Sequence, residues 1–151
     1  MTEAAILGLR GCRRFHRDFQ WWLALLGGPA FWLLWSHWHP PLPGWPGALD
    51  LLSLVLLQPF VEELIFRGWM QGYLLQSGWG RARLGVFTLA NLLTAIVFSA
   101  LHALSHTPAW ALAVFLPALA FGHFRERSGC IYAPLLLHAA YNFGYFLLWP
   151  A

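Results

Sequence analysis

Residues 49–68 read LDLLSLVLLQPFVEELIFRG, a mostly apolar run with Asp50 near its start that leads to three further ionisable side chains. Glu62 and Glu63 stand side by side at the end of that run, and Arg67 follows Glu63 by four residues. An ionised side chain inside a membrane costs roughly 2.5–3.5 kcal/mol on insertion scales, so such residues usually mark a functional site. The whole chain has six acidic residues, and two of them stand next to each other at the end of this run. The stretch therefore predicts a membrane helix that carries chemistry.

The composition is that of a membrane protein. Of the 151 residues, 59% are hydrophobic and only 10% are charged, whereas soluble domains carry about 25% charged residues. Each membrane span needs about 20 residues, so we expect one membrane-embedded domain, residues 1–151, with about five spans. We place the spans at about 19–38, 48–76, 84–104, 109–124 and 131–149. No small-x-small cleavage site follows the first of them, so we interpret it as an uncleaved span rather than a signal peptide.

Basic residues predict the orientation of this all-α, polytopic transmembrane helical bundle. They precede the first span and lie between spans two and three and between spans four and five: Arg10, Arg13, Arg14 and Arg17; Arg81 and Arg83; Arg125 and Arg127. The alternate loops, 37–47 and 105–109, contain neither Arg nor Lys. The positive-inside rule then gives a basic cytoplasmic N-terminus, residues 1–19, and a C-terminus outside.

The two glutamates are expected to play different parts. Glu63 and Arg67 are spaced i,i+4 with the acid first, the favourable order for a helical ion pair. Glu62 is rotated about 100° around the same helix, so Arg67 does not neutralise it. Glu62 is therefore the candidate general base.

The third span carries a histidine at a similar depth. Phe98 and His102 share one helix face, so the ring can restrict the imidazole. Counted from the turn near Gly80, Glu62 lies 18 residues back and His102 lies 22 residues forward. In an antiparallel hairpin the two residues fall within about one helical turn of each other. Glu62 and His102 together are candidates to polarise water.

The fifth span adds His138 and Asn142, again spaced i,i+4 on one face. They can donate hydrogen bonds to a developing oxyanion, or they can simply hold helices together. A zinc site built from Glu62, Glu63, His102 and His138 is not favoured, because the H-E-x-x-H pattern is absent. We therefore expect no metal and no cofactor.

The two cysteines lie far apart and form no C-x-x-C or other ligand spacing. We expect Cys12 and Cys130 to be small buried or interfacial residues, and the sequence predicts no disulfide between them.

Three motifs, taken together, resemble those of a known family. Glu62 to Gly68, EELIFRG, is similar to the E-E-x-x-x-R motif of the CAAX protease and bacteriocin-processing family (CPBP, also called Abi). Phe98 to His102 is similar to its F-x-x-x-H motif, and His138 to Asn142 to its H-x-x-x-N motif. They occur in the family's order, within a catalytic core at about residues 48–146.

The resemblance implies an intramembrane endopeptidase of glutamic type. In that family the first glutamate and the second-motif histidine activate water, the last His and Asn form the oxyanion hole, and the arginine supports the second glutamate. The residues implied here are Glu62, His102, His138 and Asn142 as catalytic, with Glu63, Arg67 and Phe98 supporting. Small prokaryotic members resemble proteases of C-terminal sorting signals, an analogy at family level.

The expected location is therefore the prokaryotic inner membrane. The expected partners are the lipid bilayer and a membrane-associated protein or peptide, with no nucleic acid. The substrate is a C-terminal sorting tail, a CAAX-like tail or a leader peptide. The alternative is a non-catalytic membrane protein, for bacteriocin immunity or as a helper, that uses the same polar residues for helix packing.

Overall fold

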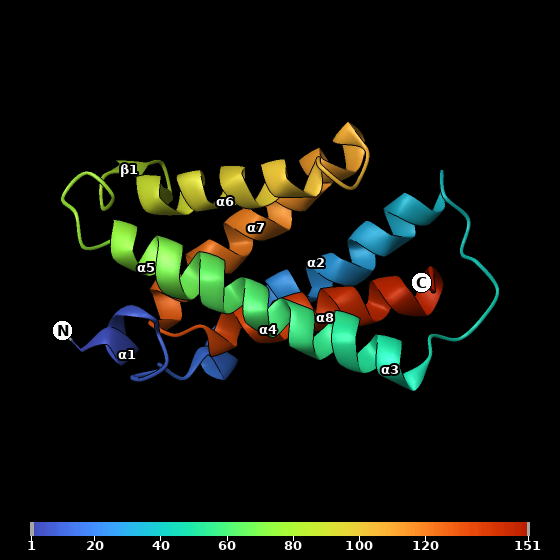
Figure 1. The fold of residues 1–151 in the computed structure, drawn as a ribbon, viewed down its shortest axis with the longest axis horizontal. Coiled ribbons are helices and arrows are strands. Elements are labelled where there is room, and N and C mark those ends of the chain that lie inside the picture. The colour runs from blue at the N-terminus through green and yellow to red at the C-terminus, as the bar shows by residue number, and fades with distance from the viewer. Residues whose placement is uncertain (1, 151) are drawn as a thin grey trace.

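The computed structural model describes residues 2–150, which form a bundle of helices with one short hairpin (Figure 1). The helices are α1 (Glu3–Ile6), η1 (Phe15–Arg17), α2 (Phe19–Ser36), α3 (Ala48–Asp50), η2 (Leu51–Leu57), α4 (Gln58–Glu63), η3 (Leu64–Met70), α5 (Gln71–Leu74), α6 (Leu89–His102), α7 (Pro108–Ser128) and α8 (Tyr132–Leu148). The two ends of the chain lie at opposite ends of the long axis. The all-α fold class is confirmed.

The stretch from α3 to α5 is one continuous helical rod with two irregular turns in its winding (Figure 1). The carboxylate of Asp50 accepts a hydrogen bond from the backbone N–H of Gly47, 3.2 Å away, where the rod begins. Segments η2 and η3 are π-helical, and the six α-helical residues of α4 stand between them. π-helical turns often occur at functional sites, and here they flank Glu62 and Glu63.

The third span was expected to begin at residue 84, but the corresponding helix in the structure begins later. Strands β1 (Arg83–Leu84) and β2 (Phe87–Thr88) form a small antiparallel hairpin, so α6 starts only at Leu89. Gly85 supplies the positive φ, 62°, that this tight turn needs. The side chain of Thr88 then caps the first turn of α6 by accepting from the N–H of Asn91. The helical prediction for 84–88 was therefore wrong.

Within residues 2–150, no helix combines the length and the apolar character needed to cross a membrane.

Helix α7 packs between α6 and α8, and α8 also packs against α2 and the rod. Two clusters of buried residues meet on α7. One joins Trp21, Phe121, Phe124, Ala133 and Leu137, and the other joins Ala95, Phe98, Ala118 and Leu119. These clusters pack α6 and α8 against α7.

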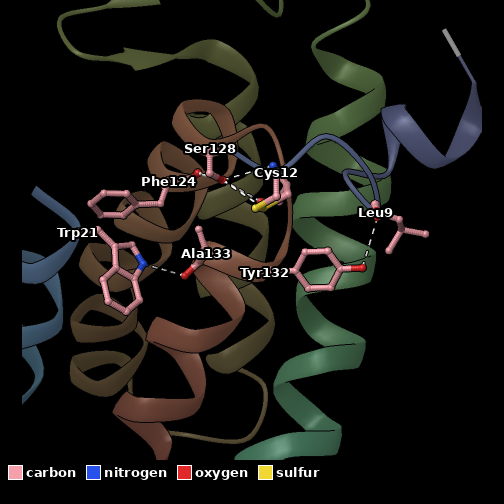
Figure 2. The surroundings of a disulfide bond; sticks show 8 residues. Leu9, Cys12, Trp21, Phe124, Ser128, Tyr132 and Ala133 are labelled. Carbon is pink, nitrogen blue, oxygen red and sulfur yellow. Dashed lines mark hydrogen bonds between the residues drawn. A yellow bond between two sulfur atoms is a disulfide. The ribbon is translucent and has the colours of Figure 1, made fainter. Parts of the chain in front are cut away.

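The N-terminal segment folds back against the turn between α7 and α8, and Cys12 forms a disulfide with Cys130 there (Figure 2). The two Cα atoms are 4.9 Å apart although 118 residues separate them in sequence. Backbone hydrogen bonds from Arg13 to Ser128 (2.8 Å) and from Ile131 to Gly8 (3.0 Å) hold the segments side by side. The expectation of two unlinked cysteines was wrong. The spacing of residues in the sequence does not indicate that these two distant segments meet in the fold.

Candidate active site

Glu63 and Arg67 form a fully buried ion pair inside the bundle. Both side chains have 0% exposure, and Nη1 of Arg67 lies 3.3 Å from Oε1 of Glu63. The geometry is that of an electrostatic contact without a directed hydrogen bond, because Nη1 has no hydrogen-bond partner among the described residues. The i,i+4 pairing predicted from the sequence is present.

The guanidinium of Arg67 is held from several sides. Its Nη2 donates to the carbonyl oxygen of Ala118, 3.2 Å away. Its central carbon lies 4.5 Å from the ring centre of Phe98 and 5.3 Å from that of Phe121. Cation–π contacts of this kind strengthen when they are desolvated. Arg67 therefore ties the rod to both α6 and α7.

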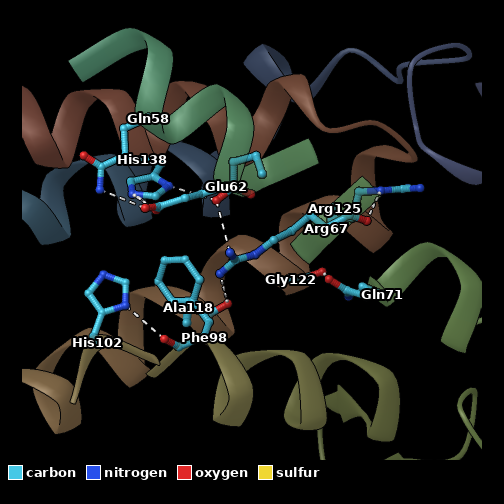
Figure 3. Close-up of polar contacts among 11 residues, drawn as sticks. Gln58, Glu62, Arg67, Gln71, Phe98, His102, Ala118, Gly122, Arg125 and His138 are labelled. Atoms are coloured by element: carbon cyan, nitrogen blue, oxygen red, sulfur yellow. Dashed lines mark hydrogen bonds and ion pairs between the residues drawn. The ribbon is translucent and has the colours of Figure 1, made fainter. Parts of the chain in front are cut away.

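His138, from α8, bridges the two glutamates (Figure 3). Its Nδ1 lies 2.9 Å from Oε1 of Glu63, and its Nε2 lies 3.6 Å from Oε2 of Glu62. The ring of Phe121 stacks on the imidazole with centroids 4.8 Å apart. Because an ionised carboxylate only accepts hydrogen bonds, Nδ1 carries the proton in the contact with Glu63. This contact was not predicted, because the sequence does not show which residues of α8 lie opposite which residues of the rod.

Glu62 is partly accessible, with a side-chain exposure of 19%, whereas Glu63 is fully buried. Its Oε1 accepts a hydrogen bond of 2.9 Å from Nε2 of Gln58, one turn earlier in α4. Sequence reasoning missed Gln58, although its spacing of four residues before Glu62 was a usable signal.

His102, at the end of α6, is held by its own helix. Its Nδ1 lies 2.9 Å from the carbonyl oxygen of Phe98, and the two rings are 4.6 Å apart. A carbonyl can only accept, so Nδ1 carries the proton and Nε2 of the neutral ring is free to take one. This packing of Phe98 against His102 is the arrangement that the sequence predicted.

Asn142, one turn after His138 in α8, is partly buried. Its Nδ2 donates to the carbonyl oxygen of Leu54 in η2, 2.8 Å away. This bond ties α8 to the rod and uses one of the two N–H groups of the amide. The other amide groups of Asn142 remain for a ligand.

A cavity of about 690 Å³ brings these groups together. Its polar lining comes from three separate parts of the chain and consists of Gln58, Glu62, His102, His106, His138 and Asn142. Aromatic and aliphatic side chains, mostly from α2, α7 and α8, supply most of the rest, among them Trp32, Val114 and Tyr145. The four residues predicted as catalytic therefore share one wall, while Glu63 and Arg67 lie behind it. No direct contact joins Glu62 to His102 among the described residues.

A comparison with models of protein families shows which family this chain belongs to. Residues 43–144 match the family model described as type II CAAX prenyl endopeptidase Rce1-like. The chain belongs to the Rce1-like family. No curated protein and no solved structure matches the chain.

Membership in the Rce1-like family confirms the resemblance drawn from the three motifs. The matched range, residues 43–144, contains the polar residues that line the cavity, Gln58, Glu62, His102, His106, His138 and Asn142. The family is one of proteases, so the chain carries the architecture of a peptidase. The roles of the individual residues stay predictions.

The arrangement of possible donor side chains decides whether the site could hold a metal ion. Among residues 2–150, no three His, Cys, Asp or Glu side chains are grouped closely enough to hold one. Structural and catalytic zinc sites use at least three protein ligands, and the described residues do not supply such a set.

Proposed function

We propose that this protein is an intramembrane endopeptidase that hydrolyses a peptide bond of a membrane-associated protein. The observation that carries the proposal is the shared cavity, in which Glu62 of α4, His102 of α6, and His138 and Asn142 of α8 meet. Membership in a family of CAAX prenyl endopeptidases supports the same reaction class.

In the proposed reaction, Glu62 takes a proton from a water molecule in the cavity. His102 assists through Nε2, which is free because Nδ1 is turned to the carbonyl oxygen of Phe98. The activated water attacks the carbonyl carbon of the substrate, and the negative charge develops on the carbonyl oxygen. The proton held by the Glu62–His102 pair then passes to the leaving amine, so the balance of protons closes without a metal.

The oxyanion is proposed to bind His138 and Asn142. Since Glu63 occupies Nδ1 of His138, a contact with the oxyanion must use Nε2–H, and His138 acts in its protonated form. Asn142 contributes the N–H that is not bonded to Leu54. Removing one oxyanion donor costs about 10²–10³-fold in kcat in well-studied hydrolases.

Two features support a substrate tail in or at a bilayer. The cavity wall is largely aromatic and aliphatic, which suits apolar side chains of a sorting tail, a CAAX-like tail or a leader peptide. Large apolar side chains also cover the outside of the bundle, with Leu33, Leu49 and Leu112 exposed by 76%, 80% and 72%. Extensive exposed apolar surface is typical of membrane or partner contact. We propose the prokaryotic inner membrane as the location.

One observation fits the packing alternative. The bond from Asn142 to Leu54 is the interhelical contact expected of a purely structural polar residue. The packing of the bundle, however, is served by Glu63, Arg67 and Gln71, which are fully buried. Glu62 and His102 face the cavity, and each makes its side-chain hydrogen bond within its own helix, so packing between helices does not account for them.

The test compares cells that express the wild type with cells that express Glu62→Gln. Mass spectrometry of membrane-protein termini should find new termini only with the wild type, and a purified wild type should cleave the same sites with chelator present. Glu62→Gln should melt within about 2 °C of the wild type, because it removes the base and keeps the shape. Identical termini in both cells would reject the protease assignment, and loss of cleavage with chelator that added zinc restores would reject the metal-free mechanism.

A further inference from the structure

Gln58 stands beside the proposed base and belongs to no motif of the family resemblance. It is the first residue of α4, its side chain is exposed, and it lines the cavity (Figure 3). Its Nε2 donates to Oε1 of Glu62 across 2.9 Å. The other carboxylate oxygen, Oε2, has its own neighbour, Nε2 of His138 at 3.6 Å. The two oxygens of Glu62 are thus approached by two different groups.

The helix geometry explains why Gln58 is the residue that reaches Glu62. Both lie within α4, where the α-helical period places residues four apart on one face. The π-helical segments η2 and η3 on either side have a different period, so the short α-helical stretch is what aligns the pair. Pro59, directly after Gln58, is buried and anchors the start of this stretch.

The hydrogen bond from Gln58 restricts the side chain of Glu62, which has few other contacts that fix its conformation. A glutamate has three rotatable side-chain bonds, and the contact with His138 is longer than a hydrogen bond. A bond from an amide N–H to a carboxylate is charge-assisted and directional. It selects the rotamers of Glu62 that keep the carboxylate on the cavity wall.

We propose that Gln58 is a positioning residue that orients the carboxylate of Glu62 to take a proton from the attacking water. This inference rests on the proposed peptidase function and adds a residue to it. Gln58 acts through Glu62 and does not itself exchange a proton. Helical pairs of this kind contribute little to stability, so the loss of Gln58 is expected to appear in catalysis and not in folding.

The first test is Gln58→Met, which keeps the length of the side chain and removes the donor. We expect kcat to fall roughly 10- to 100-fold, the loss that follows from a small misplacement of a catalytic group, with KM within twofold and the melting temperature unchanged. The matched control is Gln20→Met, an exposed glutamine at the start of α2 that does not line the cavity. It should leave kcat, KM and melting temperature at wild-type values.

The second test is Gln58→Glu, which places a second carboxyl group at hydrogen-bond distance from Glu62. Two carboxylates so close cannot both be ionised, so the pair works only while it shares a proton. The alkaline side of the pH–activity profile should therefore move to lower pH than in the wild type. A purely structural role would leave the shape of the profile unchanged.

A third measurement does not depend on activity. Infrared difference spectra against Glu62→Gln isolate the carboxylate band of Glu62, and this band should shift in Gln58→Met but not in Gln20→Met. An unshifted band, or a kcat for Gln58→Met within twofold of wild type while Glu62→Gln is inactive, would overturn the role of Gln58 and leave the peptidase proposal standing. Activity in Glu62→Gln would instead remove the peptidase proposal and this inference with it. A lowered melting temperature in Gln58→Met would assign Gln58 a structural role and overturn the inference.

Discussion

Replacing Glu63 by leucine should destabilise the bundle severely, and removing Arg67 as well should reverse much of that loss. In Glu63→Leu the guanidinium of Arg67 stays at 0% exposure and keeps one hydrogen bond, to the carbonyl oxygen of Ala118. Breaking a buried ion pair on one side costs about 3–5 kcal/mol, because a buried charge is left without its partner. For a chain of this size each kcal/mol lowers the melting temperature by about 2–4 °C. We therefore expect a fall of roughly 6–20 °C.

The double variant Glu63→Leu/Arg67→Met carries neither charge, and apolar replacement of a whole buried pair is often neutral. One defect remains, since Nδ1 of His138 loses the acceptor that lies 2.9 Å away in the wild type. An unsatisfied buried donor costs about 1–3 kcal/mol. The double variant should thus melt about 4–8 °C above the single variant Glu63→Leu, a gain of about 2 kcal/mol.

Activity should not follow stability. Both variants leave His138 without Glu63, so both should lack peptidase activity even though the double variant is the more stable. Thermal unfolding in detergent, followed by tryptophan fluorescence, and peptide cleavage measured on the same samples test the two claims. The control is Glu62→Gln, which removes a carboxylate from the cavity and should leave the melting temperature unchanged. A double variant no more stable than Glu63→Leu, or one that recovers activity together with stability, would refute this reasoning.

Three further predictions follow from the described contacts. His138→Ala and Asn142→Ala should each lower kcat by roughly 10²–10³-fold without changing metal content, as measured by peptide kinetics and elemental analysis; wild-type kcat in either would contradict the oxyanion assignment. Reporter fusions within residues 77–83 and after residue 151 should report opposite compartments, and one compartment for both would reject the five-span orientation. The hydrogen bonds from Arg127 lower the pKa of Asp18, so their stabilisation is present above the unfolded pKa of about 3.9 and is lost as pH falls through the lower folded pKa. The stability difference between wild type and Asp18→Asn should therefore shrink as pH falls below about 4, and a constant difference would contradict the linkage.

Much of the fold could be predicted because short-range sequence patterns indicate where the helices begin and end. Apolar segments bounded by Pro, Gly and Arg predicted four helices, including α2 (Phe19–Ser36) and α8 (Tyr132–Leu148), to within a few residues. The hairpin at 83–88 was missed because two-residue strands leave no periodic pattern. The π-helical turns and the Cys12–Cys130 bond were missed because they depend on how distant segments pack.

The candidate site was predictable in its members and not in its connections. The depth argument placed Glu62 and His102 at one level, and the structure places both on one cavity wall. It could not show that His138 contacts Glu63 through Nδ1, because rotation of α8 about its axis is decided by the packing of side chains such as Phe121. Motif spacing tells which residues share a helix face, and tertiary packing decides which atoms meet.

The contact between Glu63 and Nδ1 of His138 is the best explanation for the buried Glu63–Arg67 ion pair. Apolar side chains of similar volume could fill the positions of Glu63 and Arg67 without the cost of removing two charges from water. They could not offer an acceptor to Nδ1 of His138, which must be held if Nε2 is to face Glu62. Arg67 in turn is enclosed by Phe98 and Phe121, so the position of the acceptor depends on α6 and α7 as well as on the rod. Glu63 and Arg67 therefore make the orientation of His138 a property of the packed bundle, and a change in that packing reaches the proposed catalytic groups through them.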